Sequence, residues 1–301
     1  MEKIGLFIRL TRPQFIIGAA ILYAMGVGIA HYLGISINWV VYVFGQLWVI
    51  LLQLSTQYLN EYFNASADSE NQNRTPITGG SGALGTEKLP RRTALMAAYT
   101  CLAFLASLTV VMISQMTLNP TALLIMGFAL LGSLMYSIPP FKLEGSGYGE
   151  LVVSIIVAFT LPAYAFVLQA GELHRLVAMS AFPLTVMHLA MLLAFELPDY
   201  ANDIKFGKRT IMVRIGWKNG MILHNILILS AYLLLGLAAI NGMPRFVWMS
   251  VLLTLPLGLF QIWQMKNIAD GAKPNWKALT VVSMSLFGAM TYLMTFAYWI
   301  N

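Results

Sequence analysis

Long apolar segments separated by short polar stretches dominate the chain. Each apolar segment is about 18 to 25 residues long, the length that a helix needs to cross the hydrocarbon core of a bilayer. Backbone groups in hydrocarbon must be hydrogen-bonded within the protein, and these segments are too long for barrel strands, so the pattern predicts an all-α membrane protein. Nine spans are expected, at residues 14–34, 36–59, 93–114, 118–136, 150–169, 176–197, 220–240, 246–265 and 277–299.

Composition supports this interpretation. Of the 301 residues, 58% are hydrophobic and 10% are charged, whereas a soluble domain usually carries about 25% charged residues. Arg9 and Arg12 flank the first span and no small-residue cleavage site follows it, so we interpret it as a retained helix rather than a signal peptide. The one cysteine, Cys101, lies inside a span, which excludes an intrachain disulfide or a cysteine-based metal site.

Lysine and arginine are unevenly distributed between the two sides of the expected bundle. Sixteen of the 18 basic residues fall in the N-terminal segment and in the polar stretches 60–92, 137–149, 198–219 and 266–277. The other side holds only Arg175 and Arg245. Because positively charged loops stay in the cytoplasm, we expect the N-terminus inside and the C-terminus outside. The net charge of +6 then reflects juxtamembrane loops facing anionic lipid or substrate, and indicates no nucleic-acid partner.

Two polar motifs, at residues 60–75 and 195–210, repeat one another. Their shared pattern is E-x-x-[N/D]-x-x-x-D-x5-R-T, with an offset of 135 residues between the copies. The first copy contains Glu61, Asn64, Asp68, Arg74 and Thr75, and the second contains Glu196, Asp199, Asp203, Arg209 and Thr210. Internal repeats in membrane proteins commonly bracket a shared site. We expect the copies to face each other across a central cavity that opens to the cytoplasmic side.

Spacing within the motifs predicts a polar helix face. Positions three and four residues apart are neighbours on a helix surface, so Asn60, Glu61, Asn64 and Asp68 share a face, and His188 lies two turns before Glu196. Several carboxylates brought together would repel one another, and a divalent cation resolves that conflict. Oxygen ligands with open positions suit Mg²⁺ that bridges a substrate phosphate.

Basic residues beside each acidic motif complete a predicted phosphate site. Arg74 follows the first motif, and Lys208 with Arg209 follows the second. Guanidinium groups bind phosphate through two donors, while lysine acts as a point charge. The glycine-rich stretches TGGSG at 78–82 and GSGYG at 145–149 have two interpretations: backbone N–H donors for oxyanions, or flexible loops.

Taken together, these motifs resemble those of the UbiA superfamily of intramembrane prenyltransferases. The resemblance rests on N-E-Y-F-N-A-S-A-D at 60–68 and D-Y-A-N-D at 199–203. The phrases NRTPITGGSG, YSIPPFKLEGSGYGE and ELPDYANDIKFGKRT look most like the 1,4-dihydroxy-2-naphthoate branch, which serves menaquinone biosynthesis. The likeness extends over essentially the whole chain, so residues 1–301 are expected to form a single domain.

The resemblance implies Mg²⁺-dependent transfer of a polyprenyl group from a polyprenyl diphosphate to an aromatic acceptor, in an integral membrane protein of a prokaryotic plasma membrane. It implies that Asp68, Asp199 and Asp203 hold metal, with Asn60 and Asn64 in support. Arg74, Lys208 and Arg209 would bind diphosphate. Tyr136 and Lys142 match loop residues near the reacting centre, and Lys142 would also meet the diphosphate or have a structural role. Glu61 and Glu196 would lie beside the metal or near the acceptor. His188 would orient an acceptor hydroxyl or be a core histidine with no such role.

One position departs from the family pattern. Asn64 stands where the family usually has the first motif's aspartate, and its counterpart in the repeat is Asp199. An amide keeps an oxygen ligand but removes a negative charge, so the first metal should bind more weakly. Asn64→Asp is expected to raise Mg²⁺ affinity or turnover.

Other functions remain open from the sequence. Asn64 is compatible with a diverged enzyme that uses another acceptor, with a terpene cyclase, or with a non-catalytic lipid-binding protein. A secondary transporter also has repeats and polar groups inside the membrane. Carriers usually place those groups near the bilayer centre, whereas here they gather at the cytoplasmic edge.

Overall fold

The computed structural model describes residues 2–116 and 118–301. Within these residues the chain is mainly helical and forms no β-strand, and nine helical segments are long and apolar enough to span a membrane. This confirms the expected fold class and number of spans. The spans are α2 (Pro13–Tyr32), α3 (Trp39–Glu70), α4 (Arg91–Gln115), α5 (Pro120–Ser137), α6–α7 (Gly149–Ala170), α8 (Arg175–Lys205), α10 (Trp217–Ile240), α11–α12 (Arg245–Ala269) and α13 (Trp276–Ile300).

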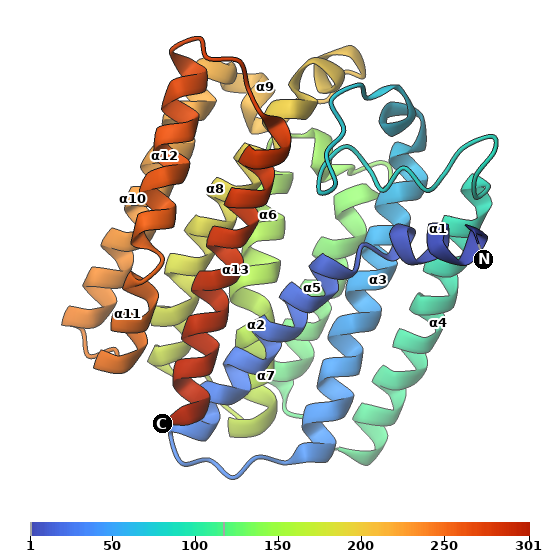
Figure 1. Ribbon diagram of the computed structural model, residues 1–301. Coiled ribbons are helices and arrows are strands. Elements are labelled where there is room, and N and C mark those ends of the chain that lie inside the picture. The colour runs from blue at the N-terminus through green and yellow to red at the C-terminus, as the bar shows by residue number, and fades with distance from the viewer. Residues whose placement is uncertain (1, 117) are drawn as a thin grey trace.

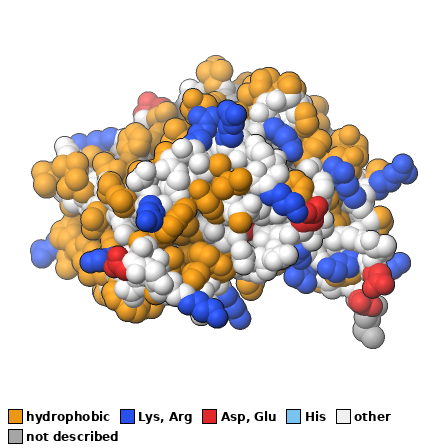
Figure 2. Space-filling view, turned by 90° about the horizontal axis from the view of Figure 1, so that it is seen from above, with side chains coloured by type: hydrophobic (Ala, Val, Ile, Leu, Met, Phe, Trp, Pro, Cys, Tyr) orange, Lys and Arg blue, Asp and Glu red, His pale blue; other side chains and the backbone are white. Residues whose placement is uncertain are grey.

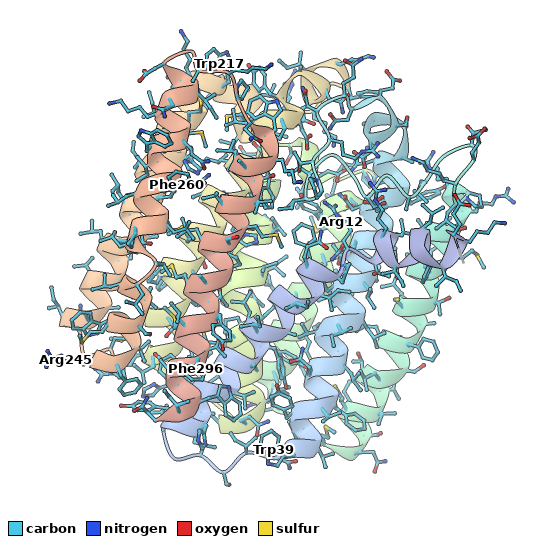
Figure 3. The ribbon with its side chains drawn as sticks, in the orientation of Figure 1. Arg12, Trp39, Trp217, Arg245, Phe260 and Phe296 are labelled. Carbon is cyan, nitrogen blue, oxygen red and sulfur yellow. The ribbon has the colours of Figure 1, made fainter. Side chains whose placement is uncertain are left out.

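The outer surface of the bundle is apolar. Leu124, Leu233 and Leu253 are each 66% exposed or more. Such exposure is unfavourable in water but favourable against lipid tails. Trp39 and Trp217 lie near opposite ends of the bundle (Figure 3). Amphipathic aromatic rings favour the two membrane interfaces, so their placement agrees with a bundle that crosses the bilayer.

Close helix contacts hold α2 in the middle of the bundle. A Cβ added at Gly26 would come within 2.1 Å of the Pro162 carbonyl oxygen on α7 (Leu161–Ala170), so only glycine permits this approach. Since lipid is as apolar as the side chains, such packing rather than water exclusion stabilises helix pairs in a membrane. Met187 on α8 and Met290 on α13 are likewise almost fully buried in the same core.

The helices that carry the two acidic motifs run further than their apolar segments. α3 continues to Glu70 and α8 to Lys205, so Asp68 and Asp203 lie on the last helical turns, beyond the expected span ends at 59 and 197. The arginine–threonine pairs of both motifs follow in the loops. No proline interrupts α3, and the polar residues occupy one face while Tyr58 and Leu59 remain buried. At 1.5 Å per residue, a helix of 32 residues is ~48 Å long, which exceeds the hydrocarbon thickness.

Two spans are interrupted within the bundle. Between α6 (Gly149–Ile155) and α7 lies a π-helical turn, η2 (Ile156–Thr160), immediately before Pro162. Proline lacks the N–H that a regular helix needs, and a π turn accommodates that loss. The second interruption separates α11 (Arg245–Leu252) from α12 (Leu255–Ala269).

Short elements cover the end of the bundle that carries the motifs. These are the 3₁₀ turn η1 (Leu143–Gly145) and α9 (Ile211–Ile215), while α1 (Glu2–Thr11) lies crosswise beside α3 and α4 (Figure 1). The long loop between α3 and α4 covers the same end, and the C-terminus lies at the opposite end (Figure 1). Seen from above, this end carries many lysine and arginine side chains (Figure 2).

Candidate active site

A cavity of about 390 Å³ lies between α2, α3, α5, α6, α8 and α13, below the loops that cover the motif end. Its polar lining residues include Arg12, Asn60, Asn64, Asp68, Tyr136, Glu144, Glu150, His188, Glu196, Asp199, Asp203 and Lys208. Apolar side chains line the remainder, among them Phe15, Ile17, Ile21, Met191, Phe195, Met284 and Phe287. Along α13 the lining extends from Met284 to Thr291, a rise of ~10 Å. The cavity therefore has a charged portion and an apolar portion.

Nine of the site residues expected from the sequence line this cavity. They are Asn60, Asn64, Asp68, Tyr136, His188, Glu196, Asp199, Asp203 and Lys208. Glu61, Arg74, Lys142 and Arg209 do not line it. The bundle thus brings both acidic motifs to one space, as the repeat predicts, but separates several of their neighbours from it.

The two motif helices touch at equivalent positions. Asn202 Nδ2 on α8 donates to the Ala67 carbonyl oxygen on α3 at 3.1 Å, and Lys205 forms an ion pair with Glu70. Both pairs join residues 135 positions apart, the offset of the sequence repeat. Asn71 Nδ2 donates to Asp199 Oδ1 at 2.6 Å and links the end of the first motif to the second. These contacts hold the two sets of carboxylates close together.

The charged portion of the cavity is rich in carboxylates. Six line it, at positions 68, 144, 150, 196, 199 and 203, against the two cations Arg12 and Lys208. Lys208 Nζ lies 3.9 Å from Asp203 Oδ1. Burial by itself would lower the pKa of Lys208, but the surrounding carboxylates of Glu144, Asp203, Asp68 and Asp199 raise it overall. Lys208 therefore remains a cation in the cavity.

The two asparagines of the first motif contact a carboxylate from a different part of the chain. Asn64 Nδ2 donates to Glu144 Oε2 at 2.8 Å, and Asn60 Nδ2 donates to the same oxygen. Glu144 lies on η1 and is 7% exposed. Burial raises its pKa, while Lys208 and the hydrogen bond from Asn64 oppose that rise.

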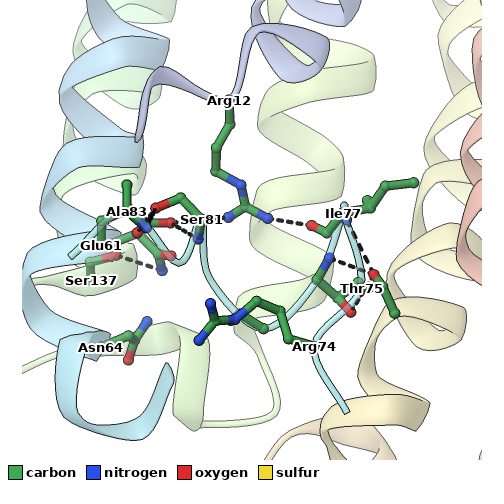
Figure 4. A network of polar contacts seen from close by, with 12 residues as sticks. Arg12, Glu61, Asn64, Arg74, Thr75, Ile77, Ser81, Ala83 and Ser137 are labelled. Carbon is green, nitrogen blue, oxygen red and sulfur yellow. Dashed lines mark hydrogen bonds and ion pairs between the residues drawn. The ribbon is translucent and has the colours of Figure 1, made fainter. Parts of the chain in front are cut away.

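Glu61 anchors the loop that follows α3. Its carboxylate accepts from the Ser81 backbone N–H at 2.7 Å and from the Ser81 hydroxyl at 2.6 Å. Arg12 Nη1 lies 3.7 Å from Glu61 Oε1, and Arg12 Nη2 donates to the Ile77 carbonyl oxygen (Figure 4). The first acidic residue of the motif thus shapes the loop above the cavity.

Arg74 holds the same loop against α3. Its Nε donates to the Gly79 carbonyl oxygen at 3.0 Å, and its Nη2 donates to the Asp68 carbonyl oxygen at 2.8 Å. Gly80 lines the cavity with φ +76°, and a Cβ there would come within 2.4 Å of Asp68 Oδ2. Glycine is therefore required where the loop passes this carboxylate.

Lys142 and Arg209 lie beside the η1 turn. Lys142 Nζ is 4.0 Å from Glu144 Oε1. Arg209 is exposed, and its backbone N–H donates to the Gly145 carbonyl oxygen at 2.9 Å. This contact joins the loop after α8 to η1, so both sequence segments help to position Glu144.

His188, Glu196 and Glu150 lie deeper on α8 and α6. Ser154 Oγ is 2.9 Å from His188 Nδ1, which orients the imidazole ring at the cavity wall. Glu196 accepts from the Met212 backbone N–H at 3.2 Å, and Glu150 accepts from the Ile211 backbone N–H at 2.9 Å. The two glutamates therefore also fix the start of α9.

Three charged cavity residues are not among the expected site residues. Arg12 was interpreted only as a topological charge, and Glu144 and Glu150 lie within the phrase YSIPPFKLEGSGYGE without having been selected. The signal for the two glutamates was present, because charge is scarce in this chain and both stand beside glycines near a span.

The donor set suits a hard cation shared with a substrate. Carboxylate and amide oxygens are the ligands that Mg²⁺ prefers, and the excess of carboxylates over cations calls for positive charge before an anion can enter. Within residues 2–116 and 118–301, no three acidic, histidine or cysteine side chains converge as a ready-made metal cage. A metal that takes part of its coordination from phosphate and water fits these residues.

Comparisons with known proteins agree with this geometry. A structure of digeranylgeranylglyceryl phosphate synthase superposes with a TM-score of 0.64 at 18% identity, covering 100% of this chain and 98% of that chain. A UbiA homologue from Archaeoglobus fulgidus bound to DMAPP and Mg²⁺ gives 0.67 at 16% identity, covering 96% and 98%. The same homologue bound to GPP and Mg²⁺ gives 0.63 at 16%, covering 96% and 99%.

At these identities the structural likeness establishes the fold. No curated protein sequence matches the chain. The profile of the UbiA prenyltransferase family, however, matches residues 17–287, which include every span at least in part and both acidic motifs. This integral, multi-pass membrane protein therefore belongs to the UbiA prenyltransferase family.

Proposed function

We propose that the protein transfers a polyprenyl group from a polyprenyl diphosphate to an aromatic acceptor in a Mg²⁺-dependent reaction. The observation that carries this proposal is the convergence of Asp68, Asp199 and Asp203, with Lys208, in the charged portion of a cavity that continues into an apolar portion. An amphiphilic diphosphate has the same two portions. The relatives that bind DMAPP or GPP with Mg²⁺ support the same assignment.

Asp68, Asp199 and Asp203 would hold the metal, and Asn64 would contribute an amide oxygen. Bound there with the diphosphate, Mg²⁺ would neutralise charge on the leaving group. Lys208 and Arg12, the cations that line the cavity among the described residues, would bind the diphosphate oxygens. These charges stand ready in the folded protein, so they stabilise the departing diphosphate without rearrangement.

The apolar portion would bind the isoprenoid chain. As the C–O bond of the allylic diphosphate breaks, its electron pair leaves with the diphosphate and positive charge develops on the allylic carbons. Phe15, Phe195 and Phe287 line the cavity and present π electrons to that charge. An electron-rich aromatic carbon of the acceptor then forms the new C–C bond, and its proton passes to the released diphosphate or to water.

We propose 1,4-dihydroxy-2-naphthoate as the acceptor, on the sequence resemblance. His188, held by Ser154 at the cavity wall, would contact an acceptor hydroxyl. The basic residues at the motif end support an active site that faces the cytoplasm of a prokaryotic cell, with the N-terminus inside and the C-terminus outside. We also propose that residues 1–301 act as one domain.

The test is pyrophosphate release by the purified full chain from geranylgeranyl diphosphate, with and without Mg²⁺ and with and without 1,4-dihydroxy-2-naphthoate. Release that requires both additions supports the transferase and its acceptor. Mg²⁺-dependent release without an acceptor would instead indicate a cyclase or a hydrolase. A folded protein that releases no pyrophosphate under any condition would contradict prenyl transfer and favour a carrier or a lipid-binding protein.

A further inference from the structure

The two copies of the acidic repeat differ in charge at one position. Asp68 in the first copy corresponds to Asp203 in the second, but Asn64 corresponds to Asp199. The first copy of the motif therefore contains one carboxylate fewer than the second. Coordination of a divalent cation depends on the number of charged ligands, so this difference should matter to a shared site.

Glu144 occupies the space beside that position. Asn64 and Asn60 both donate their side-chain N–H groups to Glu144 Oε2. Glu144 reaches α3 from η1, 80 residues along the chain from Asn64, and it lines the cavity. The carboxylate that is missing at position 64 thus lies one hydrogen bond away.

The second oxygen of Glu144 is free to accept a ligand. Oε1 is buried and has no hydrogen-bond partner among the described residues, and the side chain is 4% exposed. Its nearest cation is Lys142, whose Nζ lies 4.0 Å away on a side chain that is 43% exposed. Burying a carboxylate oxygen without a partner is costly. A bound cation would supply the partner that this oxygen lacks.

The neighbouring amides give Glu144 a fixed position. Because their N–H groups point at Oε2, the amide oxygens of Asn60 and Asn64 face other directions and remain acceptors. The Arg209 backbone N–H, bonded to the Gly145 carbonyl oxygen, holds η1 in place beside them. A glutamate held from both sides serves as a ligand without losing much side-chain freedom.

We propose that Glu144 supplies the carboxylate that the first motif lacks, acting with Asp68 as an oxygen ligand for the divalent cation that binds together with diphosphate. This inference rests on the proposed function. The first copy of the repeat would thus use a carboxylate from a distant part of the same chain in place of one on its own helix.

The exchange variant Asn64→Asp with Glu144→Gln tests this assignment. It swaps carboxylate and amide across the hydrogen bond between positions 64 and 144, so total charge and that hydrogen bond are conserved, while the bond that Asn60 donates to Glu144 Oε2 is lost. Glu144→Gln alone removes the charge. Glu87→Gln, on an exposed residue of the loop after α3, makes the same chemical change outside the cavity.

Binding of Mn²⁺ in the presence of inorganic pyrophosphate, followed by electron paramagnetic resonance on the detergent-solubilised full chain, reads out the metal site without turnover. Glu144→Gln is expected to weaken Mn²⁺ binding by about 10-fold or more, the scale seen when a metal site loses a supporting group. The exchange variant is expected to bind Mn²⁺ with an affinity within about 3-fold of that of the wild type. Glu87→Gln is expected to bind Mn²⁺ as tightly as the wild type.

Two results would overturn the inference alone. One is wild-type affinity in Glu144→Gln. The other is an exchange variant as weak as Glu144→Gln, which would show that Glu144 does not stand in for a carboxylate at position 64. If the wild type binds no Mn²⁺ with pyrophosphate, the metal dependence of the proposed function fails as well. The three outcomes are distinct in one titration series.

Discussion

Asn202 on α8 donates a hydrogen bond to the backbone carbonyl oxygen of Ala67 on α3, and the two residues are 135 positions apart. That separation equals the offset between the two acidic motifs. A contact between positions related by the repeat means that the two motif helices cross there in a nearly symmetric way. The carboxylates next to this contact, Asp68 on α3 and Asp203 on α8, are therefore brought to the same cavity.

The symmetric crossing predicts that loss of the aspartate at either equivalent position, 68 or 203, has a similar effect on activity. Asp68→Asn and Asp203→Asn should each lower kcat/KM for pyrophosphate release by ~10² or more, because each removes a charge that stabilises the departing diphosphate. A higher Mg²⁺ concentration should partly restore the activity of both variants. If only one of them loses activity, the two motifs do not share one metal–diphosphate site.

Gly80 should be needed for its conformation next to Asp68. Gly80→Ala places a Cβ within 2.4 Å of Asp68 Oδ2, so we expect turnover to fall by ~10-fold or more. Gly34→Ala is the matched control, because Gly34 has φ +78° and open space around its Cβ position. Both variants should lose roughly 1–2 kcal/mol of stability from left-handed backbone strain.

Thermal unfolding and pyrophosphate release, measured side by side, check this prediction. Equal activity in the two glycine variants would mean that the loop does not constrain Asp68 during the reaction.

Arg74 should stabilise the loop rather than bind substrate. Arg74→Lys keeps the charge but cannot make both hydrogen bonds, to the Gly79 and Asp68 carbonyl oxygens. We expect faster proteolytic cleavage within residues 71–90 of the substrate-free protein, by ~5-fold or more given the ~1 kcal/mol of a typical hydrogen bond. Arg209→Lys, at the equivalent and exposed position of the second motif, should leave that cleavage unchanged.

A different result would support the expectation from the sequence that Arg74 binds diphosphate. If Arg74→Lys raises KM for the diphosphate while cleavage of the loop stays at the wild-type rate, Arg74 binds substrate directly.

Lys208 should contribute a charge that does not titrate near neutral pH. Its pKa in the folded protein is raised above the ordinary value of 10.5. A raised pKa means that its contribution is fully present below the ordinary value and is lost only as pH rises through the higher folded value. Lys208→Gln should therefore raise KM for the diphosphate by a constant factor, ~10-fold or more, between pH 6 and pH 9.

Measuring KM for geranylgeranyl diphosphate across that range, in wild type and Lys208→Gln, decides the point. A ratio that shrinks toward 1 as pH approaches 9 would mean that Lys208 loses its proton within the range.

Local patterns in the sequence were enough to predict the spans and the acidic repeat. Apolar segments of bilayer length produce helices regardless of their neighbours, since hydrocarbon leaves the backbone no other partners. The motif spacing placed Asn60, Asn64 and Asp68 on one helix face, and these residues do line the cavity. α3 and α8 extend furthest beyond the expected span ends, because a helix continues past its apolar segment while one face stays buried.

The partners of each motif residue depended on the tertiary structure. Spacing made Glu61 and Arg74 look like members of the cavity, yet both bind the loop above it. Conversely, Arg12 and Glu144 reach the cavity from α1–α2 and η1, far along the chain from either motif. Helical periodicity reports which residues share a face within one element. Which charges meet across elements is decided when the helices pack, because burial leaves few positions where a charged group can find a partner.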